Sequence, residues 1–206
     1  MSVAAHQLTD DKLESCRRYL LALGADKLLH SGRHFLAHLE GTYRLLRGWG
    51  LPEPVCYAGL FHSMYGTDGF KRNALTLDDR HEVRALIGEE AERLVYLFCS
   101  IRRISMFERG APESIRFREA DRRTPISKSE WVALLHIEYA NTLDQCLDLG
   151  FLGKFVLTKL GRKWVHLQQH LSAACNAELA PVFASHKISQ WQYSAFQPLF
   201  WVLQRL

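Results

Sequence analysis

The chain has 206 residues, of which 48% are hydrophobic and 23% are charged, and this composition excludes disordered and fibrous proteins. Lysine and arginine number 26 against 22 aspartate and glutamate residues, so the net charge is only +4. A charge this small, without a clustered basic stretch, predicts no nucleic-acid partner. The length fits one domain, with or without an appendage.

The cysteines are widely spaced in the sequence. They are Cys16, Cys56, Cys99, Cys146 and Cys175. No two are close enough to indicate a zinc knuckle or a redox pair, so we expect buried free thiols in a reducing compartment.

No segment predicts a membrane span or a secretion signal. The longest nearly apolar stretch is residues 94–101, far short of the roughly 20 residues that cross a bilayer. Asp10, Asp11 and Glu14 stand where a signal peptide needs an apolar core. We therefore expect a soluble, cytoplasmic protein without a membrane partner.

Helix signals dominate the first half of the chain, and period-2 strand patterns are weak. Thr9 and Gly24 are expected to bound a first helix. Ser31 is expected to cap a second helix through Leu46, and Pro52 to open a short third one.

A polar loop over residues 63–74 precedes two further helices. Thr76 and Asp79 resemble a capping box, with Asp in place of the usual Glu, and predict a helix that ends at Gly88. Residues 89–106 predict another helix, with its apolar positions on one side.

The charged segment over residues 108–124 is interpreted as a mobile loop or lid. Ser127 and Glu130 form a capping box that opens a long helix, expected to stop at Gly150. Residues 164–179 predict an amphipathic helix that ends before Pro181.

The tail over residues 188–206 is rich in aromatic residues, namely Trp191, Tyr193, Phe196, Phe200 and Trp201. The prediction is an all-α fold of about seven or eight helices. Residues 1–150 are expected to form the core with its N-terminal helix, and residues 151–206 a helical extension packed on it.

Ten histidines, about 5% of the chain, are the unusual feature of the composition. His34 and His38 are four residues apart, so they share a helix face, as two ligands of one metal would, although this spacing is common by chance in a His-rich segment. His62 ends an apolar helix beside a polar loop, which suits either a site or a buried packing histidine. We interpret the others outside this region as surface or packing residues: His6, His136, His166, His170 and His186.

His38, followed 24 residues later by His62 at the end of a helix, resembles the HD superfamily. Residues 35–39 (FLAHL), 59–63 (GLFHS) and 87–95 (IGEEAERLV) are similar to segments of the hydrolase domain of (p)ppGpp synthetase/hydrolases. Residues 140–144 (ANTLD) resemble the Ala-Asp-x-Leu-Asp segment that ends the HD pattern.

The block from residue 30 to residue 98 also resembles an uncharacterised bacterial HD-like family with the pattern HSGR, HLxGTYxLL and GLFHSxYGT. The resemblance covers roughly residues 25–150. It implies a compact HD-type helical domain.

The chain departs from the HD pattern at the residues that bind metal. Ser63 stands in place of the HD Asp and Asn141 in place of the distal Asp, while Gly66 and Thr67 replace a Glu-Asp pair of the hydrolases. Since the resemblance implies two histidines and two carboxylates around a divalent ion, these changes predict a degenerate metal site. We expect no tightly bound cofactor, and at most a weak divalent metal on His38 and His62.

Four other side chains offer replacement metal ligands: His30, His34, His81 and Asp144. The pocket that the resemblance implies has expected catalytic residues His38, His62, His30 and Asp144, and expected substrate-binding residues Arg33, Ser63, Tyr65, Thr67 and Asn141. Arg33 is expected to bind a phosphate, sulfate or carboxylate group as a fork, because guanidinium binds oxyanions bidentately. Each of three residues also has a structural alternative. Arg33 is then a solvated residue, Tyr65 packs under the loop, and Asp144 pairs with Arg84 or Arg93.

Two functions follow from these features. One is a divergent HD-type enzyme that acts on a small anionic substrate through histidine acid–base chemistry, as a hydrolase or as a metal-independent lyase or cyclase. The other is a non-catalytic HD-like protein that binds a ligand or a partner. The aromatic tail suits a homodimer or protein-partner interface, or a pair of helices that covers the core.

Overall fold

The computed structural model describes residues 3–30, 33–67, 74–107, 112–118, 122–147 and 149–203. Its α-helices are α1 (Val3–Ala22), α2 (Phe35–Gly48), α3 (Glu53–Phe61), α4 (Arg80–Ile87), α5 (Glu89–Ser100), α6 (Lys128–Cys146), α7 (Gly150–Leu167), α8 (Ala173–Ser185) and α9 (Gln190–Leu203). Short 3-10 helices are η1 (Leu77–Asp79), η2 (Arg103–Phe107) and η3 (Gln168–His170). Strands are β1 (Leu29–His30), β2 (Arg33–His34), β3 (Ser114–Arg116) and β4 (Arg123–Pro125). The all-α prediction is confirmed.

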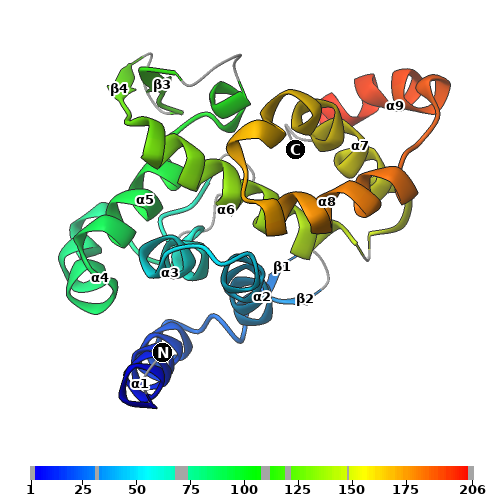
Figure 1. Ribbon diagram of the computed structural model, residues 1–206. Coiled ribbons are helices and arrows are strands. Elements are labelled where there is room, and N and C mark those ends of the chain that lie inside the picture. Colours follow the sequence, from blue (N-terminus) through cyan, green and yellow to red (C-terminus); the bar gives the residue numbers. More distant parts are fainter. Residues whose placement is uncertain are drawn as a thin grey trace.

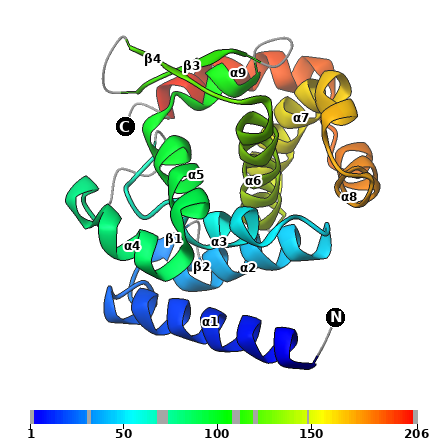
Figure 2. The ribbon, with the colours of Figure 1, turned by 60° about the vertical axis from the view of Figure 1, so that its left-hand side comes forward.

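Helix α6 is the central element, and α2, α3, α5 and α7 all pack against it (Figures 1 and 2). Ser127 and Glu130 form the expected capping box at its start, which typically stabilises a helix by about 1 kcal/mol. Side chains are buried on every face of α6, including Trp131, whose indole N–H donates to the Met106 carbonyl oxygen at 2.8 Å. A helix buried all round can bring polar side chains into the interior.

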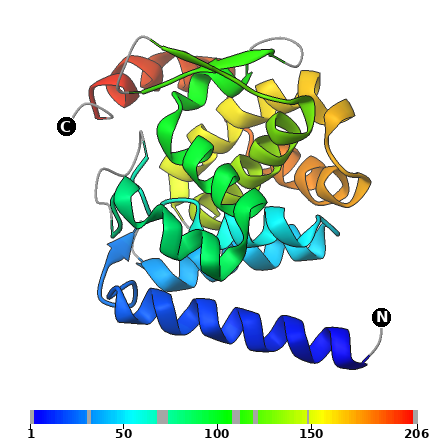
Figure 3. The same ribbon diagram turned by 90° about the vertical axis from the view of Figure 1, so that its left-hand side faces the viewer.

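Helix α1 lies along one end of the molecule, beside α2 and α4, and the β3–β4 hairpin and α9 lie at the other end (Figures 2 and 3). Helices α7 and α8 join the main core through Leu157, Leu160, Leu179 and Phe183. Helix α9 instead packs on α7 through a separate small apolar cluster in which Tyr193 stacks on Phe155. Figure 1 shows α7, α8 and α9 grouped beyond α6.

Several predicted helix boundaries were wrong, and tertiary contacts explain two of them. Helix α5 ends at Ser100, not near residue 106, because Ile101 leaves the helix to pair with Phe117. Helix α2 begins at Phe35, after the β1–β2 turn, while Ser31 lies outside the described residues. Within residues 108–124, the described part forms a β-hairpin instead of a loop.

The predicted boundaries in the C-terminal third were also wrong. Helix α6 ends at Cys146, and Gly150, with φ +53°, begins α7. Residues 164–179 are divided because Ser172 caps a new helix by accepting from the Cys175 N–H. Pro181 lies inside that helix on its exposed side, where water can satisfy the carbonyl group that proline leaves without a donor.

All five cysteines are free and buried, as expected. Burial raises the pKa of each thiol, to about 11 for Cys56 and about 12 for Cys99. Among the described residues, no helix is long and apolar enough to span a membrane.

Candidate functional site

A polar cluster inside the helical core joins three helices that are distant in sequence. His38 comes from α2, and its Nδ1 atom lies 2.7 Å from Asp144 Oδ2 on α6. The Nε2 atom of the same ring lies 3.3 Å from His62 Nε2 and 3.1 Å from Asn141 Oδ1. The structure therefore brings together four of the predicted site residues, His38, His62, Asn141 and Asp144.

Local hydrogen bonds fix the orientation of His62, which directly follows α3. Its Nδ1 atom lies 2.7 Å from the Gly59 carbonyl oxygen, and its ring meets Phe98 edge to face at 5.5 Å between centroids. The Cys99 thiol donates to the His62 carbonyl oxygen at 3.1 Å. The exposed fractions of His62 and His38 are 0% and 2%, so both imidazoles lie in the interior.

The hydrogen-bond partners determine the tautomers of the two rings. A carbonyl oxygen only accepts, so His62 donates from Nδ1 to Gly59, and neutral His62 has a lone pair on Nε2. His38 donates from Nδ1 to the Asp144 carboxylate, so in its neutral form it also has a lone pair on Nε2. With the Asn141 oxygen, three lone pairs then face one point, and such an arrangement needs a proton or a metal ion between the atoms.

Glu138 lies one turn before Asn141 on α6 and favours one orientation of the Asn141 amide, although the Asn141 Nδ2 atom has no hydrogen-bond partner among the described residues. The amide nitrogen lies on the side of the Glu138 carboxylate and acts to lower the pKa of that carboxyl. Burial has the larger, opposite effect and raises the pKa of Glu138 above its ordinary value. The reverse amide orientation would set oxygen against carboxylate, so the Asn141 oxygen faces His38.

Gly41 makes room for Asp144 on the surface of α2. A Cβ atom at position 41 would lie 1.9 Å from Asp144 Oδ1, closer than any real contact. Because Gly41 has no side chain, α2 and α6 approach closely enough for the carboxylate to reach His38, one turn earlier on α2. Sequence reasoning did not assign this role to Gly41.

The metal that the HD resemblance implies fits this donor set only as a weakly bound ion. Two imidazole nitrogens and one amide oxygen converge, and a carboxylate and a carbonyl orient the two rings, as is usual for metal-binding histidines. All three donors are neutral, and among the described residues no group of three or more His, Cys, Asp or Glu side chains is arranged to hold a metal ion. Imidazole donors suit Zn²⁺ or Fe²⁺ better than Mg²⁺.

The remaining predicted site residues have different surroundings. Ser63 is buried directly after His62, and Thr67 is buried and accepts a hydrogen bond from Arg103 at 3.2 Å. The Tyr65 hydroxyl donates to Glu92 at 3.3 Å and not to the histidine cluster. The side chains of His30 and Arg33, which pair through their backbones in β1 and β2, lie outside the described part of the chain.

The residues considered as replacement ligands do not converge on the cluster. His34 and His81 are exposed, and each bonds a backbone carbonyl near it in sequence, that of Asp26 and that of Asp78. Asp144 lies in the cluster but contacts His38 through Nδ1, on the ring side opposite the converging atoms. It pairs with neither of the arginines considered as its structural partners: Arg84 pairs with Glu92, and Arg93 with Glu130.

Three charged residues beside the cluster were missed by sequence reasoning. Glu138 neighbours Asn141, Arg103 lies 3.5 Å from Glu138 and donates to Thr67, and Arg118 donates to the Tyr65 carbonyl oxygen at 3.4 Å. The helical spacing of Glu138 and Asn141 was the available signal. Nothing local marked the arginines, because their partners are more than 30 residues away.

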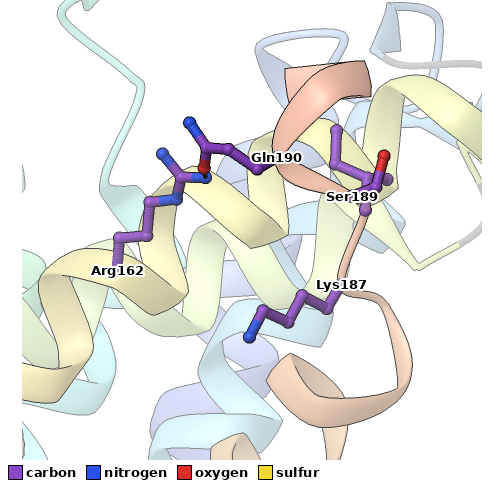
Figure 4. Close-up of a pocket in the computed structure, with 5 residues that line it drawn as sticks. Arg162, Lys187, Ser189 and Gln190 are labelled. Atoms are coloured by element: carbon purple, nitrogen blue, oxygen red, sulfur yellow. Dashed lines mark hydrogen bonds between the residues drawn. The ribbon is translucent and has the colours of Figure 1, made fainter. Parts of the chain in front are cut away.

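A surface hollow lies elsewhere. It has a volume of about 620 Å³ and is lined by Arg162 of α7 and by residues 187–190, which lead into α9 (Figure 4). Arg162 donates to Gln190 at 2.5 Å across this hollow and lies over the Tyr193 ring. No residue of the histidine cluster lines it.

One comparison with known proteins finds a match to part of the chain that supplies this site. Residues 19–103 match the family model described as a domain of unknown function (DUF6817). The matched segment contains His38, His62 and Arg103 but ends before α6, which supplies Asn141 and Asp144. No curated protein and no solved structure matches the chain.

Proposed function

We propose that the protein is a divergent HD-type enzyme that acts on a small anionic substrate by histidine acid–base chemistry. The observation that carries the proposal is the convergence of His38 Nε2, His62 Nε2 and Asn141 Oδ1, with Asp144 behind His38. The meeting of these elements from three helices, at the positions of the HD-like pattern, also supports kinship with that superfamily.

Each histidine has a defined role in this proposal. Asp144 holds His38 in one tautomer, as a carboxylate orients the base in hydrolase triads, so Nε2 is the atom that takes or gives a proton. The Gly59 carbonyl holds His62 in the matching orientation. With one proton shared between the facing nitrogens, one ring serves as acid and the other as base.

A weakly held divalent ion is compatible with the same residues. His38, His62 and Asn141 would hold it through the atoms that now converge, and His38 would remain oriented by Asp144. When bound, such an ion supplies Lewis-acid activation of water or of the substrate. We expect the purified protein to contain much less than one Mn, Fe, Co or Zn per chain, since the donors are neutral.

The test compares His38→Gln with His34→Gln, a matched control on the exposed side at the start of the same helix. A panel of small phosphate esters, sulfate esters and phosphorylated carboxylic acids is incubated with each protein, with and without chelator, and conversion is followed by NMR. We expect the His38 variant to lose roughly 100-fold or more in rate and the His34 variant to keep the wild-type rate. Absence of conversion, or equal rates in both variants, would rule out the enzyme.

One observation favours a second candidate, a non-catalytic HD-like ligand- or partner-binding protein. Both imidazoles are closed to solvent, as they are in purely structural histidine clusters. If this candidate is right, His38→Gln lowers the melting temperature without changing any reaction. Trp191 on α9, 77% exposed, marks the surface at which a homodimer or protein partner would then be sought.

A further inference from the structure

The guanidinium group of Arg103 lies beside the polar cluster and nearer the surface. Arg103, at the start of η2, donates to Thr67 at 3.2 Å, and its guanidinium lies 4.9 Å from the centroid of Phe98. Phe98 in turn contacts His62. The guanidinium therefore lies one aromatic ring away from the imidazole pair.

Arg118 places a second guanidinium in the same region. It donates to the carbonyl oxygen of Tyr65, within the turn that follows His62. The charges of Arg118 and Arg103 both act on the thiol of Cys99, which itself bonds the His62 carbonyl oxygen. Both guanidinium groups thus bond the turn that follows His62, and their partly buried position strengthens their attraction for an anion.

Glu138 holds Arg103 only loosely. The distance from Arg103 Nη1 to Glu138 Oε2 is 3.5 Å, longer than the 2.7–2.9 Å of a tight charge-assisted bond. The side chain of Glu138 is 91% buried, and among the described residues its Oε2 atom has no hydrogen-bond partner. A buried carboxylate oxygen without a donor is costly, so the Glu138 carboxylate is poorly satisfied in the free protein.

Arg103 is also more exposed to solvent than the other side chains of the cluster. Its side chain is 23% exposed, whereas His38, His62 and Asn141 are at most 2% exposed. Of these four side chains, Arg103 is therefore the one that an anion in solvent can contact.

We propose that Arg103, assisted by Arg118, is the oxyanion-binding element of this site, and that Glu138 is the internal carboxylate that a substrate oxyanion displaces from Arg103. This inference rests on the proposed function for the meaning of the site, but it concerns binding and can be measured without turnover. The ligand class is a small molecule with a phosphate or sulfate group, since a guanidinium fork matches two of its oxygens. Thr67, which Arg103 already contacts, provides a neutral hydroxyl beside the bound group.

The experiment measures binding of inorganic phosphate, and separately of sulfate, to the full chain by calorimetry. Arg103→Met should weaken binding roughly 10- to 100-fold, the range for loss of a charge-assisted hydrogen bond. Arg103→Lys keeps the positive charge but loses the two-pronged guanidinium, so its phosphate affinity should lie between those of the wild type and Arg103→Met. Arg102→Met, a substitution at the exposed neighbouring arginine, should leave binding unchanged.

Glu138→Gln gives the result that a structural role would not produce. Removing the competing carboxylate charge should tighten phosphate binding several-fold, provided that melting curves show a folded variant. Weaker or unchanged binding in Glu138→Gln would overturn the displacement of Glu138. No measurable phosphate or sulfate binding by the wild type, or equal losses in Arg103→Met and Arg102→Met, would overturn the site itself.

The outcome can be separated from that of the proposed enzyme. His38→Gln should retain phosphate binding, because the ring does not carry the anion in this proposal. Phosphate binding that depends on Arg103, without turnover of any substrate, would leave the anion site standing and refute the acid–base function.

Discussion

Two buried glutamates are linked to the turn after His62, and their surroundings differ. Glu92 connects to the turn through Tyr65, and Arg80 and Arg84 bond its two carboxylate oxygens at 2.6–3.0 Å. Glu138 connects to the turn through Arg103 at 3.5 Å, with one oxygen lacking a donor among the described residues. The first carboxylate is saturated with donors and the second is not.

This difference is the one we expect between a structural network and the anion site that we propose. The Glu92 network ties the start of α4 to α5 and leaves little capacity for a ligand. The region around Glu138 has unsatisfied capacity beside two oriented imidazoles. Buried polar groups are normally paired, so the poorly paired Glu138 beside the two imidazoles is in keeping with the proposed anion site.

The largest stability change is expected from Glu92→Gln. Loss of the charge leaves two partly buried arginines without their carboxylate partner, which should lower the free energy of unfolding by about 3 kcal/mol. Urea denaturation measures this change. Glu89→Gln is the control, because Glu89 is 88% exposed and lies 3.9 Å from Arg84, so its loss should cost almost nothing. A loss below about 1 kcal/mol in Glu92→Gln would show that the network is not structural.

Gly41→Ala should have an intermediate effect that reaches the histidines. The new methyl group occupies the position of Asp144 Oδ1, so the carboxylate must move away from His38, at a cost of about 2 kcal/mol. Any catalytic rate that depends on His38 should fall in Gly41→Ala, toward the rate of an Asp144→Asn variant. Gly48→Ala is the control, since no atom lies within 4 Å of a Cβ at that end of α2. Equal activities in the two alanine variants would remove Asp144 from the mechanism.

The smallest effect concerns the pH dependence of stability at Glu138. Because burial raises the pKa of this carboxyl in the folded state, the native protein binds the proton more tightly than the unfolded chain. Stability should therefore fall as the pH rises from the ordinary value near 4.5 to the higher folded-state pKa. Glu138→Gln should lack this fall, so its stability relative to the wild type should increase with pH and then level off. Parallel pH profiles in urea denaturation would contradict the raised pKa.

Local signals in the sequence predicted the elements that local interactions determine. The capping boxes at Thr76 and Ser127 mark η1 and α6 correctly, because both partners of each box are three residues apart. The end of α5 was misjudged because Ile101 pairs with Phe117, and no pattern near residue 101 indicates that pairing. Residue type alone did not distinguish Gly150 as a helix start from Gly150 as a stop.

The same division applies to the candidate site. His38, His62, Asn141 and Asp144 were predicted because the HD pattern that the sequence resembles relates positions more than 100 residues apart. Arg103 and Glu138 belong to no such pattern, and their contact depends on how η2 packs against α6. The space that Gly41 leaves for Asp144 is likewise a property of helix packing, which sequence spacing does not encode.

The hydrogen bond from the Cys99 thiol to the His62 carbonyl has a practical consequence for kinetics. Since this thiol is fully enclosed and its pKa is raised to about 12, it reacts with a thiol reagent only when α5 and the His62 turn separate. The labelling rate of Cys99, with the other four cysteines replaced by alanine or serine, then reports how often the interior of the site opens. At saturating reagent the labelling rate equals the rate of local opening. If phosphate slows this labelling, local opening of the helical core is coupled to ligand binding.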